Sequence, residues 1–257
     1  MAKKRTTKTS YEVPALEKGL DILELLAVHE AGLTQQQIAE YLGRSLSQLY
    51  RMLNCLLKRG YVQKATSDDR YRLSAKLFVL AHQYPPTHRL HETAMPILRG
   101  LAQQIEQSCH LGVPDEGFLL IMSQVDAPGF LSYTVRVGMR VPLAKTGSGM
   151  VLLAFQPEDK QKQWIAASAE NVNNQQRTAL LRRLKQVRRR GYEKRASQFV
   201  GGVTDLSAPV LDHTDCAVAA ITVPYLAQSQ HSRPVDVVLE EVVVAAGKLS
   251  QKLQASN

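Results

Sequence analysis

The stretch LTQQQIAEYLGRSLSQLYRMLNCLLKRGYV, residues 33–62, constrains the fold of this chain more than any other segment. It contains two short helical patterns separated by a turn at Gly43. Apolar residues follow one side of the second pattern, and the opposite side carries the polar residues Ser47, Gln48 and Arg51. Residues 44–62 contain no acid. A short helix whose polar side lacks acids is suited to approach a polyanion.

The flanking segments extend this pattern in both directions. Residues 15–29 have helical spacing, and Thr34 is a suitable N-cap for a helix over 35–42. Ser45 is an N-cap candidate for a third helix that runs to about residue 58, and Gly60 ends it. Residues 61–65 and 70–73 alternate like strands around turn residues and predict a β-hairpin. Helix, helix, turn, helix and hairpin form the order of a winged helix-turn-helix.

The charge distribution agrees with nucleic-acid binding. The formal net charge is +9, and residues 44–76 contain eight lysines and arginines against two aspartates. A localised basic block attracts phosphates because neutralising them releases counterions. The alternative is a generally basic surface with no such partner.

Several classes of protein are excluded by composition. A hydrophobic fraction of 44% supports a sizeable core, and the three cysteines are far apart, so they predict neither a disulfide framework nor a zinc site. No apolar run approaches the roughly 18–20 residues of a membrane span, and no signal peptide is evident. We therefore expect a cytoplasmic protein with no membrane partner.

The third helix is the predicted DNA-reading element. In a helix-turn-helix the second helix of the motif lies in the major groove and its N-terminal residues meet base edges. Glutamine pairs with adenine and arginine with guanine, while hydroxyl groups suit phosphate oxygens. The alternative is a merely solvated helix face. The predicted DNA-binding residues are Thr34, Arg44, Ser45, Ser47, Gln48, Tyr50, Arg51 and, on the hairpin, Arg70 and Arg72.

The second half of the chain alternates helices and strands. The patterns predict helices over 92–109, from 147, over 175–190 and over 235–253. They also predict an antiparallel hairpin of residues 117–125 and 130–137, and a strand pair over 206–212 and 216–226. We expect an α+β fold with a mixed sheet covered by helices. The expected domains are residues 11–74, a linker helix over 75–87 and residues 88–257.

The chain resembles the IclR family of bacterial transcriptional regulators. The N-terminal likeness lies in PALEKGLDILELLA, LTQQQIAEYLG, SQLYRMLNCLLKRGYV and RYRLSAKLFVLA. The C-terminal likeness lies in VGMRVPLAKTGSGMVLLAF, VRRRGYEKR and GGVTDLSAPVLDHTDCAVAAITV, so the resemblance covers about residues 11–251. It implies a winged helix-turn-helix domain, a GAF-like α/β effector-binding domain, and a homodimer or homotetramer on a palindromic double-stranded DNA operator. It also implies an organic or sugar acid effector and control of catabolic genes.

The effector site is predicted at a glycine-rich helix start. Thr146, Gly147 and Ser148 precede an apolar helix whose N-terminal amides suit a carboxylate. The alternative is a turn that only packs the helix closely. The resemblance implies that these amides hold an acidic effector.

Three further effector-binding candidates follow from matching positions of the family: Arg195, Asp205 and Thr222. All three depart from the usual residues of relatives at these positions. An aspartate at position 205 would repel a carboxylate ligand. We expect Asp205 to accept hydrogen bonds from effector hydroxyls while Arg195 supplies positive charge, which fits a polyhydroxylated acid. The alternative is a surface ion pair between the two side chains.

No catalytic motif is present. GxSxG, HExxH, Walker and GxGxxG patterns are absent, so we predict that the protein is not an enzyme and uses no cofactor or metal. The histidines His82, His88, His91 and His110 lack zinc-ligand spacing and are interpreted as structural. An architectural DNA-binding protein without a ligand remains an alternative to a ligand-responsive regulator.

Overall fold

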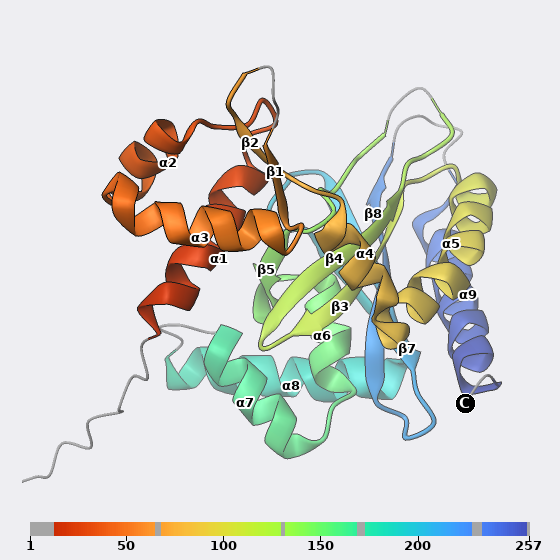
Figure 1. The fold of residues 1–257 in the computed structure, drawn as a ribbon. Coiled ribbons are helices and arrows are strands. Elements are labelled where there is room, and N and C mark those ends of the chain that lie inside the picture. Colours follow the sequence, from red (N-terminus) through yellow and green to blue (C-terminus); the bar gives the residue numbers. More distant parts are fainter. Residues whose placement is uncertain (1–12, 65–67, 130–131, 169–172, 228–232, 256–257) are drawn as a thin grey trace, which may run out of the picture. The chain divides into compact units, whose positions relative to one another are not determined.

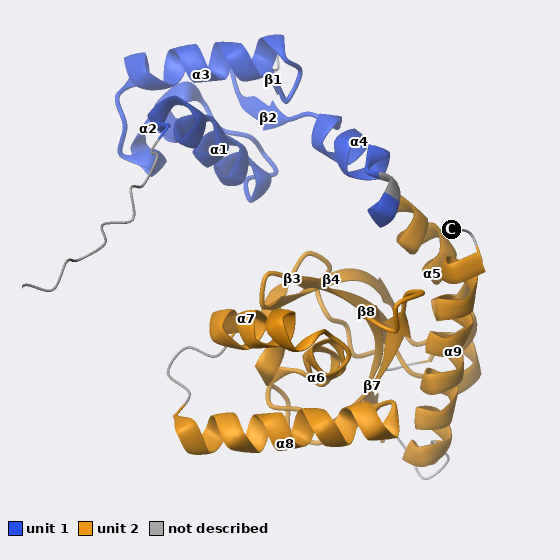
Figure 2. Cartoon of the chain, turned by 90° about the horizontal axis from the view of Figure 1, so that it is seen from below, with its two compact units in different colours: residues 1–87 blue, residues 88–257 orange. Residues whose placement is uncertain are grey.

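The computed structural model describes residues 13–64, 68–129, 132–168, 173–227 and 233–255. Residues 65–67 of the predicted hairpin lie outside the described residues. The chain divides into two compact units, residues 1–87 and 88–257 (Figure 2). In the described parts of the chain, no helix combines the length and the apolar character that crossing a membrane requires.

The first unit has the element order that the sequence predicts (Figure 1). Its elements are α1 (Pro14–Ala27), α2 (Gln35–Leu42), α3 (Leu46–Lys58), β1 (Val62–Lys64) and β2 (Tyr71–Leu73). A small core is formed where the apolar sides of the three helices meet the hairpin. Its most buried side chains are Ile22, Ile38, Leu49, Leu53 and Val62.

The helix-turn-helix geometry is fixed by local hydrogen bonds. The Thr34 hydroxyl accepts from the Gln37 amide, and the Gln37 side chain accepts from the Thr34 amide, so these two amides at the start of α2 are satisfied. Gly43 has φ of 60°, a left-handed conformation that favours glycine and lets α2 end sharply. The Gln35 side chain then donates to the Leu46 carbonyl at 3.2 Å, joining the two helices.

The hairpin is attached to the same helices by a β-bridge. The Leu33 amide donates to the Tyr71 carbonyl at 3.1 Å, and the Tyr71 amide donates back at 2.8 Å. Gly32 precedes this bridge with φ of 72°, and a Cβ atom there would lie 2.7 Å from the Tyr71 carbonyl oxygen. The close approach of the hairpin therefore requires glycine at this position.

Two helices join the units. Helix α4 spans Lys76–Gln83, and α5 spans Pro85–Ile105. Pro85 and Pro86 stand at the start of α5, because a residue without an amide hydrogen is tolerated in the first turn of a helix. The predicted helix over 92–109 was therefore wrong at both ends, and Cys109 already belongs to a strand.

The second unit contains one six-stranded sheet in the order β5-β4-β3-β8-β7-β6. The strands are β3 (Cys109–Asp115), β4 (Phe118–Val125), β5 (Arg140–Pro142), β6 (Glu193–Ala196), β7 (Val203–Leu211) and β8 (Ala217–Leu226). All described strand pairs are antiparallel, so the expectation of a mixed sheet was wrong. Continuous hydrophobic strands are usual in parallel sheets, whose two faces are both covered. This antiparallel sheet has them as well, because helices cover both of its faces.

Each face of the sheet has its own set of helices (Figure 2). Helices α5 and α9 (Val235–Ala255) pack on one face and share a core with β3, β7 and β8. The other face carries the 3-10 helix η1 (Leu143–Lys145), α6 (Gly147–Ala154), α7 (Glu158–Ser168) and α8 (Asn174–Arg190). Helix α6 is buried along its whole length, as its apolar sequence requires.

The predicted strand over residues 130–137 is not observed. Phe130 and Leu131 lie outside the described residues, and residues 132–137 join no ladder. Strand β4 pairs instead with β3 and with β5. Tyr133 and Val135 line a cavity, so the alternating pattern of this segment reflects contact with that cavity rather than strand pairing.

Candidate functional sites

The polar side of α3 is exposed, and the apolar side is buried. Ser47, Gln48 and Arg51 are exposed, and Tyr50 retains 57% of its accessible surface. Leu46, which the sequence pattern placed on the buried stripe, is half-exposed, because it stands in the first turn, before the helix reaches the core. Within the described residues, Arg51 makes no hydrogen bond or ion pair. Its guanidinium is therefore available to another molecule.

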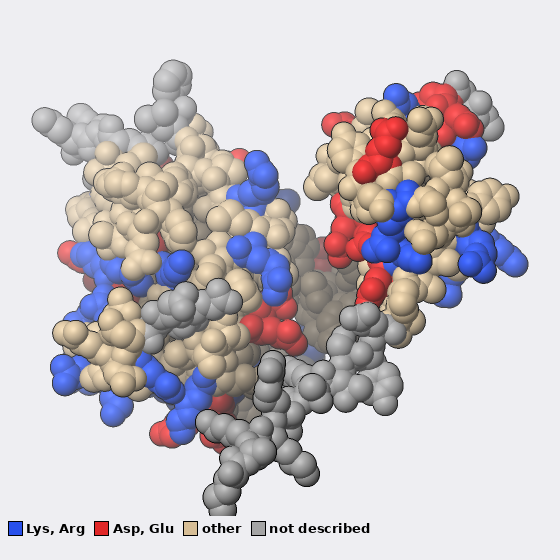
Figure 3. Space-filling view, turned by 90° about the vertical axis from the view of Figure 1, so that its left-hand side faces the viewer, with Lys and Arg blue, Asp and Glu red and all other residues tan. Residues whose placement is uncertain are grey.

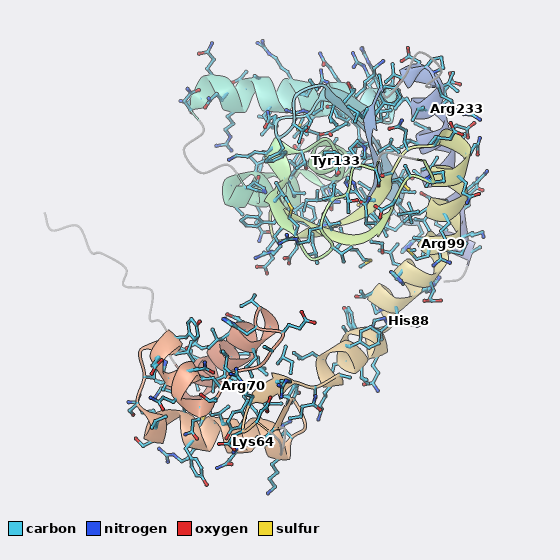
Figure 4. The ribbon with its side chains drawn as sticks, turned by 90° about the horizontal axis from the view of Figure 1, so that it is seen from above. Lys64, Arg70, His88, Arg99, Tyr133 and Arg233 are labelled. Carbon is cyan, nitrogen blue, oxygen red and sulfur yellow. The ribbon has the colours of Figure 1, made fainter. Side chains whose placement is uncertain are left out.

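The other three arginines of the predicted DNA-binding set are engaged inside the first unit. Arg44 donates to Asp21 on α1 at 2.8 Å. Arg70, labelled in Figure 4, donates to the Gly32 carbonyl at 2.9 Å. Arg72 pairs with Asp68, and this pairing lowers the pKa of the Asp68 carboxyl below its ordinary value. These contacts hold the hairpin and the start of α3 in place, and DNA contact by these three arginines stays a prediction.

The two residues predicted to cap helices differ in their side-chain contacts. Ser45 occupies the N-cap position of α3, but its hydroxyl does not cap the helix and lies 3.2 Å from the Ser47 hydroxyl. Thr34 uses its hydroxyl to cap α2. Two serine hydroxyls thus stand together at the exposed start of α3, the place where a phosphate oxygen finds unsatisfied amides and a favourable helix dipole.

The surface charge is mixed. Figure 3 shows basic and acidic side chains interspersed on the visible face of the molecule. This distribution agrees with the ion pairs of Arg44 and Arg72 with nearby aspartates.

The second unit contains a cavity of about 130 Å³ between the sheet and the start of α6. Four of the predicted effector-binding residues have a place around it: Thr146, Ser148, Asp205 and Thr222. The full lining consists of these four residues together with His110, Leu119, Ile121, Tyr133, Val135, Met139, Val141, Ser197, Phe199 and Pro224.

Arg195 does not line the cavity, contrary to its predicted role. It stands opposite Asp205 in the β6–β7 ladder, and no ion pair within 4 Å joins them in the described part of the chain. The Arg195 Nη2 atom instead lies 2.6 Å from the side-chain amide of Gln198, whose oxygen accepts from Arg195 when the amide is turned to satisfy its neighbours. Asp205 is the one carboxyl side chain in the described lining, which contains no lysine or arginine.

A row of polar side chains crosses the sheet at the cavity. His110 on β3 is the register partner of Thr222 on β8, and Thr222 is the register partner of Ser207 on β7. Thr222 Oγ1 donates to Ser207 Oγ at 2.8 Å, and Ser148 Oγ lies 2.7 Å from Thr222 Oγ1. His110 Nε2 lies 3.4 Å from Ser148 Oγ.

The proton positions in this row follow from the number of hydrogens available. Thr222 has one hydroxyl hydrogen and gives it to Ser207, so Ser148 must donate to Thr222. Ser148 then accepts from His110, which places the imidazole hydrogen on Nε2 and leaves Nδ1 as an acceptor. Burial lowers the pKa of His110 to about 4, so the ring is uncharged at neutral pH. Its Nδ1 atom is buried and has no partner among the described residues.

His110 is a site residue that sequence reasoning missed. It was interpreted as structural because it shows no ligand spacing, and only the strand register brings it beside Ser148. A serine and a histidine in contact resemble a nucleophile and its base. Here the Ser148 hydrogen is directed to Thr222, and no described carboxylate orients His110 Nδ1, so the pair lacks the arrangement of a catalytic triad.

The Asp205 carboxylate occupies the N-terminal end of α6. A Cβ atom on Gly147 would lie 2.9 Å from the Asp205 Cβ and 3.6 Å from its Oδ2 atom, so this side chain lies close to the first residue of the helix. Burial raises the pKa of Asp205, whereas the Gly147 amide and the nearby Arg195 charge act in the opposite direction. Burial also raises the pKa of the Tyr133 phenol, labelled in Figure 4, and the Asp205 charge adds to that effect. Gly147 thus serves the site through its amide rather than by lining the cavity.

Two family models match this chain. The model described as bacterial transcriptional regulator IclR C-terminal matches residues 82–251, and the IclR helix-turn-helix domain matches residues 15–65. Among curated relatives, the HTH-type transcriptional regulator KdgR of Escherichia coli is 29% identical over 88% of this chain and 87% of its own length. The Glycerol operon regulatory protein of Streptomyces griseus is also 29% identical, over 82% of this chain and 84% of its own.

Solved structures show the same fold. An IclR homologue from Microbacterium hydrocarbonoxydans, complexed with 4-hydroxybenzoate, has a TM-score of 0.78 at 22% identity and covers 94% of this chain and 99% of its own. The Thermotoga maritima IclR structure has a TM-score of 0.72 at 24% identity, over 93% and 98% of the two chains. The matched family consists of transcriptional regulators rather than enzymes. The two family models together span most of the sequence, and the chain belongs to the IclR family of bacterial transcriptional regulators.

Proposed function

We propose that this regulator recognises a palindromic operator by inserting the start of α3 into the major groove. The exposed side of α3, where Arg51 has no partner among the described residues, is the observation that carries this proposal. Gln48 and Arg51 are one turn apart at the N-terminal half of the helix and would meet base edges. Ser45, Ser47 and Tyr50 would contact the phosphate backbone.

A palindromic operator calls for two copies of the reading helix. Each copy reads one half-site, and the two-fold symmetry of the DNA matches that of a homodimer, or of a tetramer that uses two copies for each site. In this proposal residues 11–74 form the DNA-binding domain, 75–87 the linker and 88–257 the effector-binding and oligomerisation domain. The regulator would act in the cytoplasm and control catabolic genes.

The cavity of the second unit is the proposed effector site. Its mainly apolar wall and its few convergent polar groups are typical of a small-molecule pocket. The relative crystallised with 4-hydroxybenzoate supports the idea that this fold accepts a small molecule. The described lining contains Asp205 and no basic side chain, so an acidic effector would meet a carboxyl group without a basic partner, and the effector's acidic character is not retained in the proposal.

Genome-wide footprinting of the full-length protein tests this function. We expect discrete sites with two related half-sites, each bound far more tightly than random duplex at the same salt concentration. Occupancy should change when the cell grows on the compound that fills the cavity. Uniform binding along the genome, with no response to any growth substrate, would indicate an architectural protein instead.

A further inference from the structure

The cavity of the second unit differs from a carboxylate site, and we infer that it takes an uncharged molecule with an apolar body and a hydroxyl group at one end, such as a small alcohol or phenol. The inference rests on the proposed function of this cavity as the effector site. It names the chemical class of the ligand. The sequence analysis expected an organic or sugar acid instead.

The position that would hold an anionic ligand is filled by the protein itself. The amides at the start of a helix attract a negative charge. The Asp205 side chain lies beside Gly147 at this helix start, and the Gly149 amide donates to the Thr146 hydroxyl at 2.8 Å. A Cβ atom on Gly147 would lie 2.9 Å from the Asp205 Cβ, which shows how closely this side chain is packed against the helix start. Asp205 thus takes the place of a ligand carboxylate.

The polar end of the cavity offers acceptors. Asp205 presents its carboxyl oxygens, which can accept a hydrogen bond from a ligand. A hydroxyl group on the ligand can donate to this carboxyl group. A carboxylate on the ligand has no hydrogen to give at neutral pH and would place its oxygens against those of Asp205.

The remaining wall selects an apolar body. Leu119, Ile121, Val135, Val141 and Phe199 line it, and the volume of about 130 Å³ limits the occupant to a small molecule. A cavity of about 150 Å³ in another protein holds benzene, so one six-membered ring is the appropriate scale. Lysine and arginine are absent from the described lining, which removes the usual compensation for a buried carboxylate.

Three probe molecules with the same carbon skeleton test the proposed chemical class of the ligand. Benzyl alcohol, benzoate and benzylamine share one ring and differ only at the terminal group, which is neutral, negative or positive. Their dissociation constants would be measured by ligand-observed NMR titration of the full-length protein at neutral pH. We expect benzyl alcohol to bind the unaltered protein at least about tenfold more tightly than benzoate, the effect of one charged hydrogen-bond partner.

The variant Asp205→Asn provides the second comparison. An asparagine keeps the shape of the side chain, removes its charge and adds a donor, so the preference for the alcohol over benzoate should fall about tenfold. Asp236→Asn is the matched control, because Asp236 lies at the start of α9, is exposed and pairs with Lys194 outside the cavity. This control should retain the preference of the unaltered protein.

Three results would overturn the inference: tighter binding of benzoate, tighter binding of benzylamine, or no binding of any probe to the unaltered protein. Gel shifts on the footprinted operator, run in parallel, distinguish these results from a failure of the proposed function. Specific operator binding with a preference for benzoate would preserve the regulator and reject the ligand class. A preference for the alcohol without operator binding would preserve the ligand class and reject the proposed function.

Discussion

The Arg44 guanidinium donates to the Asp21 carboxylate at 2.8 Å and joins the segment before α3 to α1. Arg44 and Arg51 lie seven residues apart and were both predicted to contact DNA, but they have different surroundings. Arg44 is held inside the first unit, whereas Arg51 is exposed on α3. This difference separates residues that orient the reading helix from residues that are free to read a base.

Arg51→Ala should reduce binding to the specific operator about 10- to 100-fold, because an arginine–guanine contact contributes roughly 1–3 kcal/mol of discrimination. Binding to random duplex should change much less, since that binding depends on phosphate contacts. Gel shifts on specific and random duplexes at one salt concentration measure both quantities.

Lys58→Ala is the control for this prediction. It removes the same charge from the opposite end of α3, where no base contact is expected. If Arg51→Ala reduced the affinity for the specific and the random duplex by the same factor, Arg51 would contact phosphate, and the proposed contact with a base would be wrong.

Arg70→Ala should lower the stability of the first unit rather than act mainly on DNA. The substitution removes the donor to the buried Gly32 carbonyl, and leaving such an acceptor without a partner costs about 1–3 kcal/mol. Thermal unfolding measures the change. Lys64→Ala, on the exposed side of the same hairpin, should have little effect on the melting temperature. Equal melting temperatures for the Arg70 variant and the unaltered protein would contradict a structural role.

Gly149→Ala should disrupt the packing of α6. A Cβ atom at this position would lie 2.0 Å from the Leu143 carbonyl oxygen, and backbone atoms of η1 cannot move aside easily. We expect a loss of about 3 kcal/mol or more in the free energy of unfolding, as in severe overpacking. Denaturant titration measures this quantity.

Gly247→Ala is the matched substitution for Gly149→Ala. It lies within α9, and a Cβ atom there meets no atom within 4 Å. It should raise the free energy of unfolding by about 0.5–1 kcal/mol, because alanine loses less conformational entropy in a helix than glycine does. Similar effects of the two substitutions would show that η1 yields to the added methyl group.

The stability of the second unit should depend on pH through His110. Burial lowers the pKa of this ring from 6.5 to about 4 in the folded state. Between these values the unfolded chain binds a proton that the folded chain does not, so the free energy of unfolding falls as the pH falls from 6.5 toward 4. The slope from this group approaches about 1.4 kcal/mol per pH unit.

Denaturant titrations at a series of pH values check the contribution of His110. His110→Gln should have a shallower dependence than the unaltered protein over this range. His213→Gln, at the exposed turn between β7 and β8, should keep the original dependence. An identical pH dependence in the His110 variant would mean that this ring takes up its proton equally in both states.

The sequence by itself determined the winged helix-turn-helix and the family. The periodic apolar positions, the Thr34 cap and Gly43 act over a few residues, so their structural effect can be predicted without knowing the rest of the fold. The exposure of Ser47, Gln48 and Arg51 follows from the same helical period. The strands of β7 and β8 were also predictable, because each is a long apolar run next to turn residues.

Only the tertiary structure decided which polar groups meet. His110, Thr222 and Ser207 are distant in sequence and become neighbours through the register of β3, β8 and β7. The same folding leaves Arg195 out of the cavity lining and places the Asp205 side chain beside Gly147. Local sequence patterns specify the type and faces of an element, but strand register and helix docking depend on long-range packing of the whole core. Long-range packing therefore decided that Asp205 lines the cavity and Arg195 does not, and no local motif predicts this.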